Sequence, residues 1–172
     1  MTPVSYLRYG RDMTLACQGG HPGTVAVAGV AGSGKSTLGR ALATALRLPL
    51  IDLDAVTNPL LDRLVGPVLP VHWLAAGYGG PVREGRYAAL RAVTHDAVTT
   101  AGGAVLVAPF TAELAGGPAW AELVAAVAPT ELRVVHIDGD PELFARRRAA
   151  RGAARDAHRP DGPAAPPAVP HI

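Results

Sequence analysis

Short apolar runs alternate with segments of helical periodicity along most of the chain. Four runs rich in alanine, valine, leucine and isoleucine predict buried parallel strands, at residues 24–28, 50–53, 104–108 and 132–137. The segments that follow them predict helices, at residues 35–46, 59–65, 83–100, 118–127 and 141–151. This order predicts an α/β fold, a three-layer sandwich with a parallel sheet of four to five strands and helices on both faces.

Capping residues place several of these helix ends. Asn58 followed by Pro59 is typical of an N-cap with proline in the first turn, and Asp140 followed by Pro141 has the same form. Gly152 suits the end of the last helix, because glycine readily adopts the left-handed C-cap conformation. In the helix at 83–100, four residues mark the face that we expect to be buried: Leu90, Val93, Ala97 and Val98.

The two ends of the chain lack such a pattern. Residues 1–22 show no clear periodicity, and we expect a poorly ordered arm there. Residues 156–172 are rich in proline and alanine and predict a loop or disordered tail, although residues 169–172 are a candidate for a fifth strand. The expected folded domain is therefore residues 23–155.

Composition narrows the class of protein. The 172 residues suffice for one α/β domain, and a formal net charge of only +2 gives no indication of a general nucleic-acid surface. No apolar run is long enough to span a membrane, and the N-terminus lacks the pattern of a secretory signal. Cys17 is the single cysteine, which excludes an internal disulfide and favours a reducing compartment. We expect a cytoplasmic monomer or homodimer that binds neither nucleic acid nor membrane.

The most specific motif lies between the first predicted strand and the first predicted helix. Residues 29–36 read GVAGSGKS and fit the phosphate-binding pattern G-x-x-x-x-G-K-[ST]. Lys35 is the only lysine among the 16 Lys and Arg residues of the chain. We expect Lys35 to reach the β- and γ-phosphates of a nucleoside triphosphate and Ser36 to ligate Mg²⁺. The residues expected to bind the nucleotide in this segment are Gly32, Ser33, Gly34, Lys35, Ser36 and Thr37.

Two aspartates follow the second predicted strand. Asp52 and Asp54 alternate with apolar residues, so an extended segment places both carboxylates on one side. We expect Asp52 to hold a water of the Mg²⁺ shell and Asp54 to accept a proton from a substrate hydroxyl. The alternative for either residue is that it only caps the next helix.

Other polar residues are candidates for contact with a substrate. Arg83 and Arg86 begin the long helix, where they either clamp an anionic or polyol substrate or form a solvated face. Thr111 and Glu113 follow the third strand, at the edge where a substrate wall would lie, and are otherwise ordinary loop residues. The His-Trp pair at 72–73 is a further candidate in the middle loop, although an isolated histidine is more often structural or solvent-exposed.

A cluster of arginines follows the fourth strand. Its members are Arg146, Arg147, Arg148, Arg151 and Arg155. Such a cluster either forms a lid over a bound nucleotide, stabilising charge on the transferred phosphoryl group, or is a solvated helix face. Arg147 and Arg151 are four residues apart and share one face, so we assign catalytic roles to these two and nucleotide contact to Arg147.

On these motifs the chain resembles the small P-loop kinases, a group within the AAA-family ATP-binding proteins. They include shikimate, gluconate and adenylylsulfate kinases, chloramphenicol phosphotransferase and the zeta-toxin relatives. The resemblance covers residues 24–155 and rests on the loop at 29–38, the Asp52 and Asp54 pair, and the segment at 140–143 followed by the arginines. It implies a shikimate-kinase-like fold, a middle substrate-binding segment at about 56–86, a lid at about 146–160, and ATP and Mg²⁺ as cofactors.

The chain also departs from this group. The third strand lacks the Walker-B carboxylate, which leaves metal binding to Ser36 and Asp52, and the fifth strand is not evident. Our leading hypothesis is an ATP-dependent phosphotransferase that acts on the hydroxyl of a metabolite or antibiotic, with Lys35, Asp54, Arg147 and Arg151 as catalytic residues. The alternatives are a regulatory ATPase or switch, and a kinase of a nucleotide, RNA end or nucleotide sugar. The sequence names neither the acceptor nor a preference for ATP over GTP.

Overall fold

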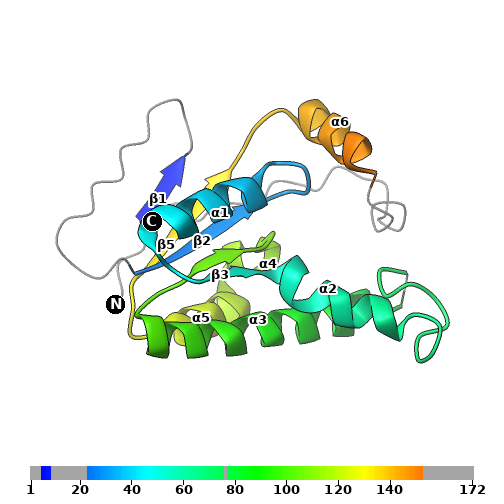
Figure 1. Cartoon of the computed structure of the whole chain (residues 1–172), viewed down its shortest axis with the longest axis horizontal. Helices are drawn as coiled ribbons and strands as arrows, with labels where there is room; N and C mark the ends of the chain where they lie inside the picture. Colours follow the sequence, from blue (N-terminus) through cyan, green and yellow to red (C-terminus); the bar gives the residue numbers. More distant parts are fainter. Residues whose placement is uncertain (1–4, 9–22, 76, 153–172) are drawn as a thin grey trace.

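Five parallel strands form one sheet in the order β1-β5-β2-β4-β3, which confirms the predicted α/β class (Figure 1). The structure, a computed structural model, describes residues 5–8, 23–75 and 77–152. The strands are β1 (Ser5–Arg8), β2 (Thr24–Gly29), β3 (Leu50–Asp52), β4 (Val105–Val107) and β5 (Leu132–Ile137). The helices in the described residues are α1 (Lys35–Leu46), α2 (Leu53–Leu64), α3 (Gly79–Ala101), α4 (Thr111–Leu114), α5 (Gly117–Val127) and α6 (Pro141–Arg151).

Strand β2 lies at the centre of the sheet, and its two faces pack against different helices. Val25 and Val27 pack with α1 on one face, whereas Ala26 and Ala28 belong to the core shared with α3 and α5 on the other (Figure 1). A Cβ atom at Gly39 of α1 would lie 2.3 Å from Val107 Cγ2, so glycine allows α1 to lie close against β4. The predicted three-layer sandwich is therefore present.

The sheet order brings the ends of three strands to one edge. Strand β4 separates β2 from β3, and Asp52 at the end of β3 lies opposite Val107 at the end of β4. In parallel sheets, ligands bind beyond the carboxyl ends of the strands, at the point where the strand order reverses. The loop after β2 and the aspartate at the end of β3 both reach this edge.

The fifth strand is one that the sequence did not predict. Strand β1 lies within residues 1–22, where we expected a poorly ordered arm, and it pairs with β5 so that Ser5 lies opposite Arg133. Four residues are too few for a clear periodic signal. Residues 169–172, the other candidate for a fifth strand, lie outside the described residues, as do Cys17 and the predicted tail.

The start of α2 differs from the prediction. The helix begins at Leu53, and the Asp52 carboxylate caps it by accepting the N–H of Asp54 at 3.0 Å. Asn58 and Pro59, which we expected to open a helix, lie inside it. Their prediction as a helix start was wrong because Asp52 supplies a cap six residues earlier. Asp54 consequently lies in the first turn of a helix and not on an extended segment.

Two further predictions need correction. Helix α3 begins at Gly79, before the predicted start at Arg83, and Val93 is 42% exposed instead of buried. Thr94 lies in the core instead, where its hydroxyl donates to the carbonyl of Leu90 at 2.7 Å. Helix α4 was not predicted at all. Within the described part of the chain, no helix has both the length and the apolar character needed to cross a membrane.

Candidate active site

The loop between β2 and α1 has the geometry that its sequence predicts. Gly32 and Gly34 adopt left-handed backbone conformations, with φ of 85° and 94°. Helix α1 then begins at Lys35, whose Nζ donates to the carbonyl of Val30 at 3.3 Å. The loop and the first turn of α1 together present backbone N–H groups and a positive helix end, the arrangement that binds phosphate.

Helix α6 packs directly on this loop. A Cβ atom at Gly32 would lie 2.4 Å from the carbonyl oxygen of Phe144, so only glycine permits the contact. Arg148 Nη1 also donates to the carbonyl of Ala31 at 3.2 Å. Sequence reasoning included Arg148 in the arginine cluster but preferred Arg147 and Arg151, because a contact between a side chain and a distant backbone carbonyl leaves no spacing signal.

A pocket of about 610 Å³ opens beside the loop. One part of its wall comes from the loop and α1: Gly32, Gly34, Lys35, Ser36, Thr37 and Arg40. Another part comes from the end of β3 and from α2: Asp52, Asp54, Ala55, Asn58, Pro59 and Asp62. Arg147 of α6 completes the lining. The structure thus brings together most of the residues expected to bind nucleotide and both of those expected to bind metal, but only Asp54 of the four expected to bind substrate.

Among the residues predicted to bind nucleotide, Ser33 is the one that does not line this pocket. Its side chain is buried, and its hydroxyl has no hydrogen-bond partner within the described residues. The hydroxyl oxygen would lie 2.8 Å from a Cβ atom placed on Gly29, so the two residues interlock inside the loop. The Ser33 N–H donates to the carbonyl of Val30 at 3.2 Å. The nucleotide-binding role predicted for Ser33 stays a prediction.

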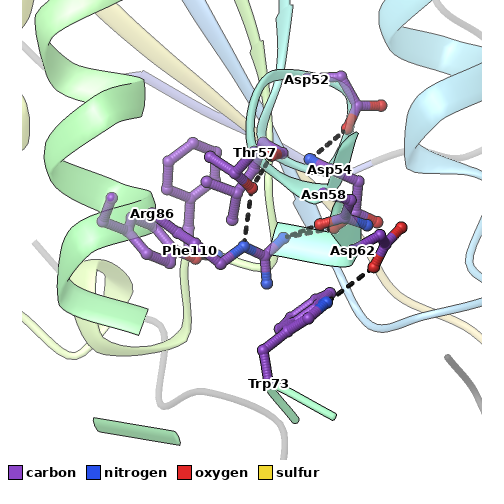
Figure 2. Close-up of polar contacts among 10 residues, drawn as sticks. Asp52, Asp54, Thr57, Asn58, Asp62, Trp73, Arg86 and Phe110 are labelled. Atoms are coloured by element: carbon purple, nitrogen blue, oxygen red, sulfur yellow. Dashed lines mark hydrogen bonds and ion pairs between the residues drawn. The ribbon is translucent and has the colours of Figure 1, made fainter. Parts of the chain in front are cut away.

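Arg86 of α3 binds the face of α2 that carries Asp54 (Figure 2). Its Nη2 donates to Asp54 Oδ1 at 2.6 Å and to Asn58 Oδ1 at 3.1 Å, and its Nε donates to Thr57 Oγ1 at 2.9 Å. The Thr57 hydroxyl donates in turn to the carbonyl of Leu53 at 2.6 Å. Arg86 therefore fixes the position of the Asp54 carboxylate from behind the pocket wall, and it does not itself line the pocket.

Trp73 supports this arrangement from below the guanidinium (Figure 2). The Arg86 guanidinium carbon lies 5.0 Å from the centre of the Trp73 ring, and the indole Nε1 donates to Asp62 Oδ1 at 2.8 Å. His72 stacks on Trp73 with 5.1 Å between ring centroids. The pair at 72–73, a candidate for substrate contact, does not line the pocket. Trp73 instead joins α2 to α3 through Asp62 and Arg86.

Arg83 has a different partner from Arg86. Its Nη2 lies 3.0 Å from both carboxylate oxygens of Glu113, which is 1% exposed. Its guanidinium carbon also lies 4.2 Å from the ring centre of Tyr87. Burial, together with the negative charge of Glu113, raises the pKa of Tyr87 to about 12. Arg83, which is partly exposed, and Glu113, which is buried, therefore link α3 to α4, and neither lines the pocket.

Thr111 is the remaining residue that we predicted to bind substrate. It is exposed at the start of α4 and does not line the pocket. The side chain of Arg151 lies outside the described part of the structure, whereas Arg147 lines the pocket as predicted. Sequence reasoning missed Asn58 and Asp62, although with Asp54 they follow a four-residue spacing that a correctly placed α2 would have revealed.

The sheet, the loop and the pocket define a P-loop protein of the α/β class. A family model described as an AAA domain matches residues 25–164, and the chain belongs to this family. No curated protein matches the chain.

Two solved structures illustrate the fold. A presumed kinase from Chloroflexus aurantiacus is similar over 83% of this chain and 74% of its own, with 23% identity and a TM-score of 0.62. A sugar kinase from Janibacter sp. HTCC2649 is similar over 81% of this chain and 72% of its own, with 22% identity and a TM-score of 0.51. The fold is that of the small P-loop kinases, which confirms the resemblance drawn from the motifs.

Proposed function

We propose that the protein is an ATP-dependent phosphotransferase that moves the γ-phosphoryl group of ATP to a hydroxyl of a small molecule. The observation that carries this proposal is that Lys35, in the first turn of α1, and Asp54, in the first turn of α2, line one pocket. The pocket, at about 610 Å³, lies within the range of roughly 300–1,000 Å³ that is typical of small-molecule sites. A phosphate-binding loop facing a positioned carboxylate is the arrangement that phosphoryl transfer to a hydroxyl requires.

The proposed step assigns a role to each wall. The acceptor hydroxyl oxygen forms a bond to the γ-phosphorus, the bond from that phosphorus to the bridging oxygen breaks, and ADP leaves. The hydroxyl proton passes to the Asp54 carboxylate, which Arg86 holds in place at 2.6 Å. Lys35 and Arg147 supply positive charge to the phosphate oxygens during transfer.

The chemistry of the pocket oxygens fits Mg²⁺. The Ser36 hydroxyl and the Asp52 carboxylate line the same pocket, and Mg²⁺ prefers oxygen ligands. Among the described residues there is no group of three or more His, Cys, Asp or Glu side chains arranged to hold a metal ion. This is the pattern of an ion that is bound by one or two protein oxygens together with phosphates and water. When bound, Mg²⁺ neutralises charge on the β- and γ-phosphates.

The test is an assay of ADP release by the purified chain in the presence of pooled acceptors. The pools are neutral polyols, sugar acids, amino alcohols including aminoglycosides, and nucleosides. We expect one pool to stimulate ADP release strongly and to yield a phosphorylated product. The Lys35→Ala variant should lose both activity and ATP affinity, whereas Asp54→Asn should lose turnover while it still binds ATP.

The matched control is Asp96→Asn, because Asp96 is an exposed acid of α3 that does not line the pocket. This variant should retain the activity of the parent chain. Slow ATP hydrolysis that no pool accelerates would contradict the proposal and favour a regulatory ATPase instead.

A further inference from the structure

Charge is distributed unevenly around the pocket. The cationic side chains in its lining are Lys35, Arg40 and Arg147, which belong to α1 and α6. The anionic side chains are Asp52, Asp54 and Asp62, which belong to the end of β3 and to α2. One half of the pocket is therefore suited to phosphate, and the other half is acidic.

The acidic half is one face of α2. Asp54, Asn58 and Asp62 are spaced four residues apart, and Ala55 and Pro59 lie beside them on the same face. At a rise of about 1.5 Å per residue, this wall extends roughly 12 Å from Asp54 to Asp62. A molecule whose hydroxyl lies at Asp54 would reach Asp62 if it were the size of two linked rings.

The two arginines at the start of α3 already have anionic or polar partners. Arg86 donates to Asp54, Thr57 and Asn58, and Arg83 pairs with buried Glu113. Neither guanidinium lines the pocket. We expected these arginines to clamp an anionic or polyol acceptor, but an acceptor carboxylate lying along α2 would meet aspartates.

Asp62 is held in place without being neutralised. Its Oδ1 accepts the indole N–H of Trp73 at 2.8 Å, and Trp73 is 2% exposed (Figure 2). Among the described residues no Lys, Arg or His forms an ion pair with Asp62. A buried neutral donor thus orients a solvent-exposed carboxylate that lines the pocket, where a cationic group of a ligand can bind it.

The backbone of the same wall also favours hydrogen-bond donors. Pro59 has no N–H, so it cannot donate the helical hydrogen bond to the carbonyl of Ala55, four residues earlier. Both residues line the pocket. A ligand hydroxyl or ammonium group could donate to that carbonyl, whereas a carboxylate could not.

We infer that the acceptor is a hydroxylated molecule with a basic nitrogen, an amino alcohol or amino sugar, whose ammonium group binds Asp62 while its hydroxyl lies at Asp54. This inference rests on the proposed phosphotransfer for the identity of the site. It excludes sugar acids as preferred acceptors, because their carboxylates would lie against the acidic wall.

The test compares matched acceptor pools in the phosphotransfer assay. One pool contains aminoglycosides and amino alcohols, a second contains the same compounds after N-acetylation, and a third contains sugar acids. We expect the amine pool to give a kcat/KM at least about tenfold above the other two, as befits one charge-assisted contact. Equal or better activity with the acetylated or acid pool would overturn the inference while leaving the proposed function intact.

The Asp62→Asn variant isolates the charge, because asparagine still accepts the Trp73 indole N–H. We expect it to raise KM for the amine acceptor about tenfold or more, to leave KM for ATP within about twofold, and to remove the preference over the acetylated pool. Asp96→Asn is the control for loss of an acid elsewhere on the surface. An unchanged amine preference in Asp62→Asn would also overturn the inference.

Direct binding separates the inference from the proposed function. If no pool stimulates turnover, the proposed function fails, and calorimetric titration of the amine pool into the ATP-bound chain still tests the acidic wall. Binding of the amine pool that is lost in Asp62→Asn supports the wall as a site for cations. Absence of binding to the parent chain contradicts it.

Discussion

Arg83 places a single nitrogen, Nη2, at 3.0 Å from both carboxylate oxygens of Glu113. The two residues are 30 positions apart, on α3 and α4, and the Glu113 side chain is 1% exposed. This ion pair anchors the segment after β4 to the long helix. Arg83, engaged in this pair, is not part of the pocket lining.

Removal of Arg83 should destabilise the fold. Arg83→Ala leaves the Glu113 charge buried without its partner, and we expect a loss of about 2–3 kcal/mol in the free energy of unfolding, less than for a fully buried pair because Arg83 is 37% exposed. Urea unfolding measures this loss. Arg91→Ala is the matched control, because its partner Glu122 is 56% exposed and such surface pairs contribute at most about 1 kcal/mol. Equal losses in the two variants would contradict the prediction.

Arg148 should affect nucleotide binding through the loop that it contacts. Arg148→Ala removes the hydrogen bond to the carbonyl of Ala31, and we expect KM for ATP to rise about tenfold, the equivalent of one such contact, with little change in KM for the acceptor. Arg146→Ala is the control, because Arg146 is 66% exposed and lies 3.8 Å from Glu142, which is 85% exposed. Steady-state kinetics of the two variants would refute a positioning role if both left KM for ATP unchanged.

The two serines of the loop should behave in opposite ways. The Ser33 hydroxyl is buried without a partner in the described structure, so Ser33→Ala should keep ATP turnover and gain up to about 1 kcal/mol in stability. Ser36 lines the pocket, and Ser36→Ala should lose a metal ligand, at a cost of at least the roughly 10–100-fold that weaker outer-shell contacts contribute. Mg²⁺ titrations of turnover distinguish the two. Loss of activity in Ser33→Ala would show that its hydroxyl moves toward the ligand.

The raised pKa of Tyr87 should make the protein less stable at alkaline pH. Its pKa is raised to about 12 in the fold from 10.0, first by burial and then by Glu113. Between these two values the unfolded chain loses the tyrosine proton while the folded chain keeps it. Ionisation of Tyr87 therefore does not lower the free energy of unfolding below pH 10. As the pH rises from 10 toward 12 the free energy of unfolding falls, by about 3 kcal/mol in total.

Urea unfolding at pH 8, 10 and 11 tests this dependence. Tyr87→Phe should remove the alkaline loss, although at pH 8 it should already cost about 1–2 kcal/mol, because the N–H of Phe110 loses its acceptor, the Tyr87 hydroxyl, at 3.0 Å. Tyr78→Phe, at the N-cap of α3, should retain the loss. The same alkaline slope in Tyr87→Phe and the parent chain would show that another group is responsible.

The predictable parts of this protein are those with local causes. The bounds of α1 follow from the glycine loop before it, and α6 follows from Asp140, whose carboxylate accepts the N–H of Glu142 at 2.8 Å. Helix α2 was misplaced because Asp52 and Asn58 are both good caps, and only the packing of the helix selects the first.

The residues of the site were likewise predictable only where a local motif places them. Lys35 follows from the motif and Asp52 from the strand pattern, and both line the pocket. Asp54 lines it as well, although it lies in the first turn of α2 and not on the predicted extended segment. Arg83 binds Glu113 and Arg86 binds Asp54, and both partners lie about 30 residues away in the chain. No local sequence pattern reveals such distant contacts. Asp62 required the correct start of α2.

The contact between Gly32 and Phe144 has a consequence for mutational tolerance. Gly32 needs both a positive φ and an empty Cβ position, whereas Gly34 has a positive φ but open space around it. Asparagine adopts the left-handed conformation more easily than other residues with side chains. A saturation library selected for stably folded protein without ligand should therefore retain asparagine at position 34 but only glycine at position 32, since any larger residue there would push α6 away from the loop.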